Sequence, residues 1–202
     1  VTERPIDVLV QKRKSSPYVL EQLVPALQAK GLRVEVQSGW VDDLVDLFNR
    51  SKIYLYDSAE YWRGRGVSEG FGLPPLEALA CGCVLFSSFN HALADTLTPG
   101  VTAHQIGQGT LDNDLVRISA AVASPSQWHP APSTIEELLA DSSEARWCER
   151  WNEILAQLND LVRHGAMSQT SELVLRSPST RRLRWSQRQD RLRGKVVNRL
   201  SG

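Results

Sequence analysis

The stretch from Ser68 to Ser88 constrains the fold of this 202-residue chain more than any other, because it joins a glycine-rich loop, a helix and a strand. Leu73 to Ala80 is rich in strong helix formers, and Pro74 and Pro75 fall in its first turn, where a helix tolerates proline. Cys83 to Phe86 is an apolar run bounded by turn residues, which is typical of a buried strand. A helix that runs straight into a buried strand indicates an α/β fold.

The same stretch has the chemistry of a site for a sugar joined to a phosphate. A glycine loop that leads into a helix exposes backbone amides at the positive end of the helix dipole, which favours an anionic group. Glu69 lies in the loop and Glu77 about a turn and a half into the helix, so both reach a ligand that rests on the helix start. Carboxylates accept hydrogen bonds from sugar hydroxyls, as the acidic residue that holds a ribose in dinucleotide folds does.

The run Glu69-Gly-Phe-Gly-Leu-Pro-Pro-Leu-Glu77 resembles the signature of retaining glycosyltransferases with the GT-B fold, in particular glycosyltransferase family 4. In that family the first glutamate contacts the transferred sugar and the second binds the ribose of the nucleotide. The resemblance therefore implies that Glu69 is the catalytic residue and that Glu77 holds the ribose. It also implies that backbone amides line the sugar and the diphosphate at four positions, Gly70, Phe71, Gly72 and Leu73.

The chain on either side of the signature alternates strands and helices. Ile6 to Gln11 and Ile53 to Tyr56 are apolar strand-like runs, and the segment between them contains helical spacing around Leu23 and a half-exposed strand around Val34. This alternation predicts a parallel sheet with crossover helices. The resemblance covers roughly residues 5 to 130, and it implies a Rossmann-like parallel sheet with flanking helices, one half of a GT-B fold.

Lys12, Arg13 and Lys14 follow the first predicted strand, at the end where open parallel sheets bind their ligands. Their position resembles the place where the family keeps an arginine and a lysine on the diphosphate. We therefore expect this cluster to contact the donor phosphates, with a solvated charge run as the alternative. The family's usual glycine spacing is absent, and which of the three side chains reaches the ligand stays open.

Three further segments are candidates for the rim of the site. Asp57 to Val67 is expected to be a long loop, either a surface connection with aromatic packing or a rim that contacts donor or acceptor. Asp112-Asn113-Asp114 is best explained as the capping of a following helix, not as a metal site. His91 lies near the end of the strand after the signature, where it is a candidate for lining the cleft. We expect no metal and no cofactor besides the nucleotide-sugar donor.

Pro130 and Pro132 mark a change of composition. We predict a nucleotide-sugar-binding Rossmann-like domain over residues 1–130, a docking helix region over 131–166 and a basic tail over 167–202. The docking helix is a C-terminal extension whose aromatic face must pack on the sheet domain or on a partner domain. This face is formed by Trp147, Trp151, Ile154, Leu155, Leu158, Leu161 and Val162.

The charge balance separates the tail from the rest of the chain. The formal net charge is zero, yet nine of the 23 basic residues and a single acid, Asp190, lie from Arg176 onward. Such a tail is either a solvated terminus or a contact for an anionic membrane surface. We expect no nucleic-acid partner.

The cysteines and the lack of a membrane-spanning run indicate the compartment. Cys81, Cys83 and Cys148 are odd in number and lack zinc spacing, so they are expected to be buried thiols in a reducing compartment. We therefore predict a cytoplasmic protein, peripheral at a membrane if the tail binds lipid. The first residue is valine, which suggests a piece of a longer polypeptide whose N-terminal acceptor domain lies outside this chain.

These observations predict the donor-binding half of a retaining, metal-independent glycosyltransferase, which transfers a sugar from a nucleoside-diphosphate sugar to a glycan or lipid-linked acceptor. The alternative is a catalytically inactive nucleotide-sugar-fold module that serves in binding or assembly. A nucleotide-dependent oxidoreductase is excluded, because no glycine fingerprint follows the first predicted strand.

Overall fold

The computed structural model describes residues 3–66 and 69–163. The chain divides into two compact units, the first ending at Arg146 and the second beginning at Trp147. Each unit is described separately below.

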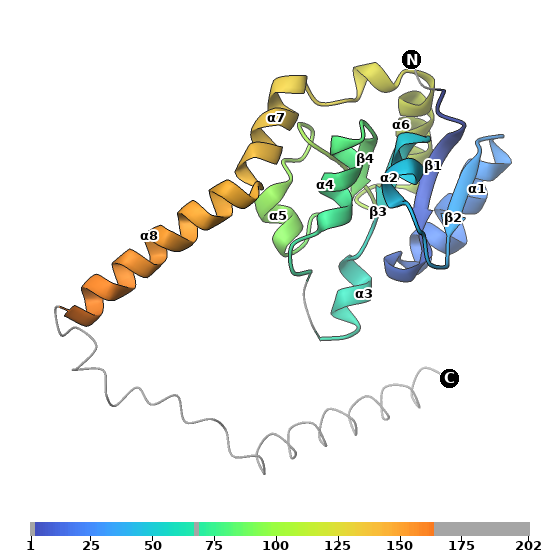
Figure 1. The fold of residues 1–202 in the computed structure, drawn as a ribbon. Helices are drawn as coiled ribbons and strands as arrows, with labels where there is room; N and C mark the ends of the chain where they lie inside the picture. The colour runs from blue at the N-terminus through green and yellow to red at the C-terminus, as the bar shows by residue number, and fades with distance from the viewer. Residues whose placement is uncertain (1–2, 67–68, 164–202) are drawn as a thin grey trace, which may run out of the picture. The chain divides into compact units, whose positions relative to one another are not determined.

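The first unit is built on a five-stranded, fully parallel sheet in the order β2-β1-β3-β4-β5 (Figure 1). The pairing is continuous across the sheet, since Val8 lies opposite both Val34 and Ile53, and Ile53 lies opposite Val84. All the strands therefore end at one edge. The strands are β1 (Ile6–Gln11), β2 (Val34–Gln37), β3 (Ser51–Tyr56), β4 (Val84–Ser87) and β5 (His104–Gln105).

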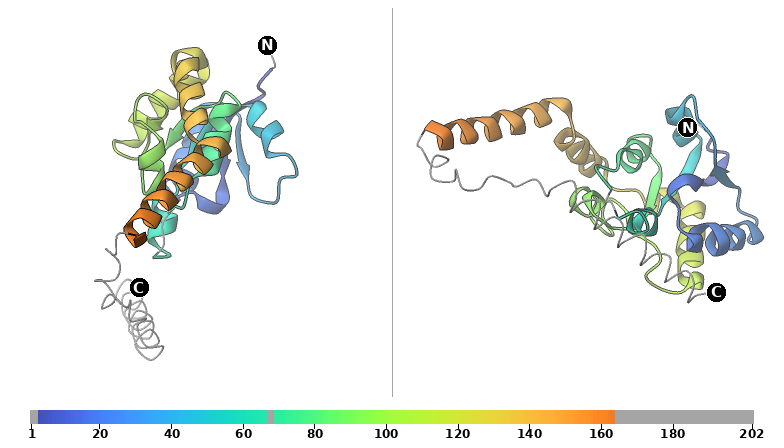
Figure 2. Two further views of the ribbon diagram at one scale, coloured as in Figure 1. Left: turned by 60° about the vertical axis from the view of Figure 1, so that its left-hand side comes forward. Right: turned by 90° about the horizontal axis from the view of Figure 1, so that it is seen from below.

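Helices cover both faces of this sheet (Figure 2). On β3, Ile53 and Leu55 face one hydrophobic core while Tyr54 and Tyr56 face the other, because side chains alternate along a strand. The first core lies under the π-helical turn η2 (Tyr18–Leu23), α1 (Val24–Ala29) and α6 (Leu111–Ala123). The second lies under α2 (Leu44–Asn49), α4 (Leu73–Ala80) and α5 (Ala92–Thr96). The predicted α/β class with a parallel, Rossmann-like sheet is confirmed.

The connection between β1 and β2 begins with a helix cap and then forms a π-helical turn. Ser16 Oγ accepts a hydrogen bond from the Val19 amide at 3.2 Å, so Ser16 caps the start of this segment. The turn that follows is π-helical instead of α-helical. Pro25 explains the difference, because it has no amide hydrogen to give to the carbonyl four residues earlier.

Two expectations for the loops are wrong. The segment after β3 is not a loop throughout, since it contains the short helix α3 (Ala59–Arg63), drawn below the sheet in Figure 1. The cap of α6 is Thr110, whose hydroxyl accepts from the Asn113 amide, and not the acidic cluster. Asp114, in that cluster, is instead buried with 1% of its surface exposed.

Arg4 links three segments of this unit, because its guanidinium donates hydrogen bonds to the carbonyl oxygens of Phe48, Ser51 and Cys81. The helix α7 contacts α4, and Leu138 packs against the second core. The remaining elements are η1 (Lys12–Lys14), η3 (Pro125–Gln127) and α7 (Pro132–Asp141).

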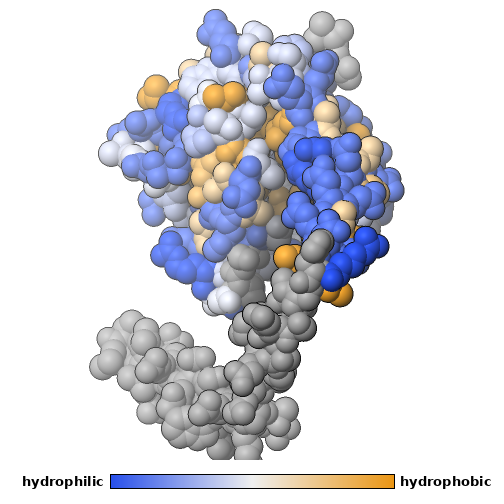
Figure 3. All heavy atoms as spheres, turned by 90° about the vertical axis from the view of Figure 1, so that its left-hand side faces the viewer, coloured by the Kyte–Doolittle hydropathy of each residue, from blue (hydrophilic) through white to orange (hydrophobic). Residues whose placement is uncertain are grey.

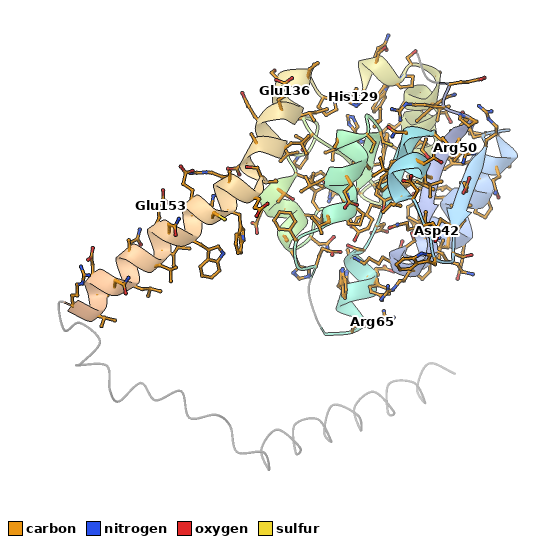
Figure 4. All side chains as sticks on the ribbon, in the orientation of Figure 1. Asp42, Arg50, Arg65, His129, Glu136 and Glu153 are labelled. Atoms are coloured by element: carbon orange, nitrogen blue, oxygen red, sulfur yellow. The ribbon has the colours of Figure 1, made fainter. Side chains whose placement is uncertain are left out.

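The second unit is represented by α8, which spans Glu144–Arg163 and begins within the last residues of the first unit. Trp147, Trp151 and the other five apolar residues of the predicted docking face are 45–59% exposed. Trp147 and Trp151 contact each other edge to face at 5.8 Å between ring centroids. Glu153, labelled in Figure 4, lies on this helix. The predicted basic tail lies outside the described residues, and the predicted boundaries at 130 and 166 stay predictions.

Large apolar side chains also reach the surface of the first unit, for example Trp40, Phe71, Leu73 and Val116. Figure 3 shows one side of the molecule, where orange hydrophobic residues are interspersed among blue hydrophilic ones. Within the described residues, no helix is both long and apolar enough to cross a lipid bilayer.

Candidate functional site

The candidate site lies at the carboxyl edge of the sheet. The strand order reverses direction between β1 and β3, and open α/β sheets bind ligands outside the carboxyl ends of strands at such a switch point. The segment after β1 carries the basic cluster, and the segment after β3 carries α3 and then the glycine loop. The structure thus brings the two predicted halves of the site, the cluster and the signature, to one edge.

Glu69 is the centre of this edge, and its side chain is buried with three donors around it. One carboxylate oxygen accepts from Lys14 Nζ at 3.2 Å. The other accepts from the Tyr56 hydroxyl at 2.7 Å and from the indole Nε1 of Trp62 at 2.6 Å. A carboxylate has about four acceptor positions, so one stays available for a ligand hydroxyl.

These contacts keep Glu69 ionised at neutral pH. Burial alone would raise the pKa of the Glu69 carboxyl, but hydrogen bonds from Trp62 and Tyr56 and the charge of Lys14 outweigh it and lower this pKa below its ordinary value. Burial, together with the hydrogen bond to Glu69, raises the pKa of the Tyr56 hydroxyl, which therefore stays protonated and donates. The site holds a fixed carboxylate that accepts hydrogen bonds.

The three side chains of the basic cluster have different surroundings in the structure. Lys14 is half-buried, bonded to Tyr56 and Glu69, and its ammonium lies 5.1 Å from the centre of the Trp62 ring. Lys12 and Arg13 are exposed on η1. The prediction left open which of the three faces the site, and the geometry favours Lys14.

The glycine loop offers backbone amides without acceptors. Within the described residues, the N–H groups of Gly70, Phe71, Gly72 and Leu73 donate to no protein atom. Pro74 and Pro75 have no N–H groups, so the free donors of the helix start lie in the loop that precedes them.

Gly72 is required at the turn into α4. Its φ of +79° is in the left-handed region, and a Cβ atom there would lie 2.4 Å from Leu93 Cδ2. A side chain at this position would therefore be strained and would also collide with α5. The close packing at Gly72 fixes the turn from the loop into α4.

A cavity of about 400 Å³, the Trp40 hollow, adjoins the basic cluster on the β2 side. Its walls include Arg13 and Lys14 after β1, the Gln37–Val41 segment after β2 and Pro74 at the start of α4. Trp40 is 90% exposed, and its indole donates to Asp42, which is labelled in Figure 4. Glu77 is exposed three residues after Pro74, and so lies on the same side of α4 as this hollow.

A second cavity of about 400 Å³, the α3 hollow, lies on the β5 side of the edge. It is bounded by segments that follow four strands, β1, β3, β4 and β5. Its lining is described with the further inference below. His91 is exposed, has a φ of +51° and lines neither hollow.

Sequence reasoning missed Tyr56 and the structural role of Asp114, and it placed Trp62 in a candidate rim segment without linking it to Glu69. Tyr56 was interpreted as part of an apolar strand, although its place at the carboxyl end of β3 was a usable signal. Asp114 accepts from the Tyr18 hydroxyl at 2.7 Å and from the Gly107 amide at 2.9 Å, and it pairs with Arg117. The described residues contain no group of three or more histidine, cysteine, aspartate or glutamate side chains placed to bind a metal ion.

Comparison with known proteins shows which solved structures share the fold and then which family the chain belongs to. Solved structures that share this fold include the GtfA/B complex (TM-score 0.57, 16% identity, 78% of this chain, 37% of that chain). Another is the pneumococcal O-GlcNAc transferase GtfA in complex with UDP and GlcNAc (TM-score 0.53, 13% identity, 77% of this chain, 36% of that chain). The model of the family described as "Glycosyl transferases group 1" matches residues 20–122, just over half of the chain.

The chain therefore belongs to the group 1 glycosyl transferases, and the predicted resemblance to GT-B glycosyltransferases is confirmed. The serotype-specific mannosyltransferase WbdA of Escherichia coli is 33% identical over 84 residues, which is 40% of this chain. That match spans 9% of WbdA, so the chain corresponds to a small part of the curated relatives it matches.

Proposed function

We propose that this chain is the donor-binding half of a retaining glycosyltransferase of family 4 type, which transfers a sugar from a nucleoside-diphosphate sugar. The observation that carries the proposal is Glu69, a buried and ionised carboxylate next to a loop of free backbone amides and an ammonium group. A sugar offers hydroxyls to the carboxylate and a diphosphate offers oxygens to the amides and the ammonium.

The other predicted donor contacts follow along the same edge. The diphosphate is placed against the amides of Gly70 to Leu73 and against Lys14, and the ribose against Glu77. The nucleoside then extends into the Trp40 hollow, whose volume of about 400 Å³ suits a small ligand. Lys12 and Arg13 add positive charge at the rim, where exposed charges steer an anionic ligand.

The proposed reaction breaks the bond between the anomeric carbon and the diphosphate oxygen. The acceptor hydroxyl oxygen bonds to the same carbon on the same face, and its proton passes to the leaving phosphate. The loop amides and Lys14 stabilise the negative charge that develops on the diphosphate, which is the largest contribution that a fixed polar site makes. Glu69 holds the sugar in position, and no metal ion has a role in this proposal.

The relatives suggest which donors to test first. WbdA is named a mannosyltransferase, and the pneumococcal structure holds UDP and GlcNAc. A panel of UDP-glucose, UDP-GlcNAc and GDP-mannose therefore tests which base and which sugar the donor site prefers. The acceptor is proposed to be a glycan or a lipid-linked sugar, bound largely by a further domain, so we expect little transfer by this chain alone. We place the protein in the cytoplasm, peripheral at a membrane if the basic tail binds anionic lipid.

Calorimetry with UDP and GDP tests the nucleotide site. Replacing Glu77 by alanine removes at least one hydrogen bond to a charged acceptor, worth about 1.5–3 kcal/mol, so the dissociation constant should rise by at least about 10- to 150-fold. Glu137→Ala, an exposed glutamate on α7, is the matched control and should leave binding unchanged.

Glu69→Gln tests the contact with the sugar independently of the contacts with the nucleotide. We expect this variant to bind the free nucleoside diphosphate like the unmodified chain and to bind the nucleotide sugar more weakly. If neither UDP nor GDP binds, the proposal is refuted, and a catalytically inactive module that serves in binding or assembly becomes the better interpretation.

A further inference from the structure

The α3 hollow is a second, polar cavity at the same edge of the sheet, and nothing in the proposed donor site uses it. Four of its lining side chains have free polar groups, since they make no hydrogen bond or ion pair to residues 3–66 and 69–163. These side chains are Glu60, Arg63, Gln105 and Gln108. A polar ligand requires hydrogen-bond donors and acceptors that have no other partner, and these side chains supply them.

The walls of the hollow are fixed before any ligand arrives. Tyr18 and Gly107, on opposite segments, are both bonded to the buried carboxylate of Asp114. Asp57 accepts a hydrogen bond from the Ser16 hydroxyl, which ties the segment after β3 to the segment after β1. A site that is already ordered loses less entropy when it binds.

The charges of the lining favour a neutral ligand. Asp57 and Glu60 are acidic and Arg63 is basic, so a phosphate would meet more repulsion than attraction. A hydroxyl group both donates and accepts, and it matches a lining of carboxylates, amides and a guanidinium. The half-buried ring of Phe89 adds an apolar surface of the kind on which the C–H face of a sugar ring packs.

The helix α3 connects this hollow to the candidate catalytic carboxylate. Trp62 donates to Glu69, whereas Glu60 and Arg63, three residues apart on the helix, line the hollow. A ligand in the hollow therefore lies across α3 from the carboxylate that is proposed to hold the transferred sugar. We propose that the α3 hollow binds a neutral sugar residue of the acceptor, an inference that rests on the proposed function.

The test uses amide spectra of the full 202-residue chain, in which Gly107 and Gly109 report on the hollow and Gly70 reports on the donor loop. The probes are the methyl α-glycosides of glucose, galactose, mannose and N-acetylglucosamine. Each is added to about 10 mM, because millimolar binding corresponds to only about −4 kcal/mol. We expect at least one glycoside to shift Gly107 and Gly109 and to leave Gly70 in place, whereas UDP should shift Gly70.

Two exposed variants locate the contact. Glu60→Gln and Gln108→Ala each remove or weaken one hydrogen-bond partner, so each should raise the Kd of the glycoside about fivefold. Glu137→Gln and Gln127→Ala are the matched controls away from the hollow and should bind like the unmodified chain.

The inference is overturned if no glycoside shifts Gly107 or Gly109, or if the hollow variants bind as tightly as their controls. A chain that binds a glycoside in the hollow but neither UDP nor GDP would refute the proposed donor site and leave the saccharide site standing. A chain that binds UDP but no glycoside would do the reverse.

Discussion

Replacing Tyr56 by phenylalanine tests whether Glu69 is a charged group held by its neighbours. The change removes the hydroxyl that donates to Glu69 at 2.7 Å and keeps the ring in the second core. A hydrogen bond to a charged group contributes about 1.5–3 kcal/mol, so the free energy of unfolding at about pH 7 should fall by that amount. Tyr54→Phe is the matched control on the same strand, because it removes a 2.7 Å bond to the neutral Gln11 and should cost about 0.5–1.5 kcal/mol.

The pH dependence of this loss of stability shows whether Glu69 is charged. The pKa of Glu69 is lower in the folded chain than its ordinary value of 4.5, so its stabilisation is present above that value and is lost as the pH falls through the folded pKa. The cost of Tyr56→Phe should therefore shrink toward that of Tyr54→Phe in acid, while the cost of Tyr54→Phe stays constant. Urea unfolding between about pH 7 and pH 3 measures both. Equal costs for the two variants at every pH would refute a charged Glu69.

Three further predictions follow from packing and burial. Gly72→Ala should reduce the free energy of unfolding by about 1–3 kcal/mol in thermal or urea unfolding, because a left-handed backbone and a contact with Leu93 both oppose the added carbon; an unchanged midpoint would contradict the packing. Asp114→Asn should cost about 1.5–3 kcal/mol through weaker bonds from Tyr18 and Gly107 to this buried side chain, and a cost below about 0.5 kcal/mol would contradict its structural role. Burial raises the pKa of Cys83 to about 12, so a thiol reagent at about pH 8 should modify the exposed Cys148 and spare Cys83, as peptide mapping would show.

The sequence was sufficient to predict the fold of the first unit, because its strands and helices have clear local sequence patterns. Strands such as Ile6–Gln11 are continuous apolar runs and α4 combines strong helix formers with first-turn prolines, and both signals are local. The two glutamates of the signature were found by their spacing and by family resemblance. Their different surroundings, with Glu69 buried and Glu77 exposed, depend on tertiary packing that spacing does not encode.

The segment after β3 could not be predicted because individual side-chain contacts hold it, and these contacts leave no pattern in the sequence. The helix α3 has five residues, too few for a periodic pattern, and its stability comes from side-chain contacts. Tyr61 and Trp62 pack edge to face at 4.9 Å, and Arg65, labelled in Figure 4, lies 3.6 Å from the centre of the Tyr61 ring. Trp62 is anchored by Glu69, seven residues later. The role of Asp114 was predicted wrongly for a different reason, because its partner Tyr18 is 96 residues away in the sequence.

The helix α3 also has a consequence for the design of new enzymes. None of its residues is buried, and neither hydrophobic core includes any of them, so the sheet does not depend on its sequence. Its neighbours Tyr56 and Glu69, by contrast, are fixed by the sheet edge and the glycine loop. Residues 59–66 therefore form a replaceable cassette, and a library confined to them, with Trp62 kept, would vary one wall of a saccharide pocket without disturbing the folded scaffold.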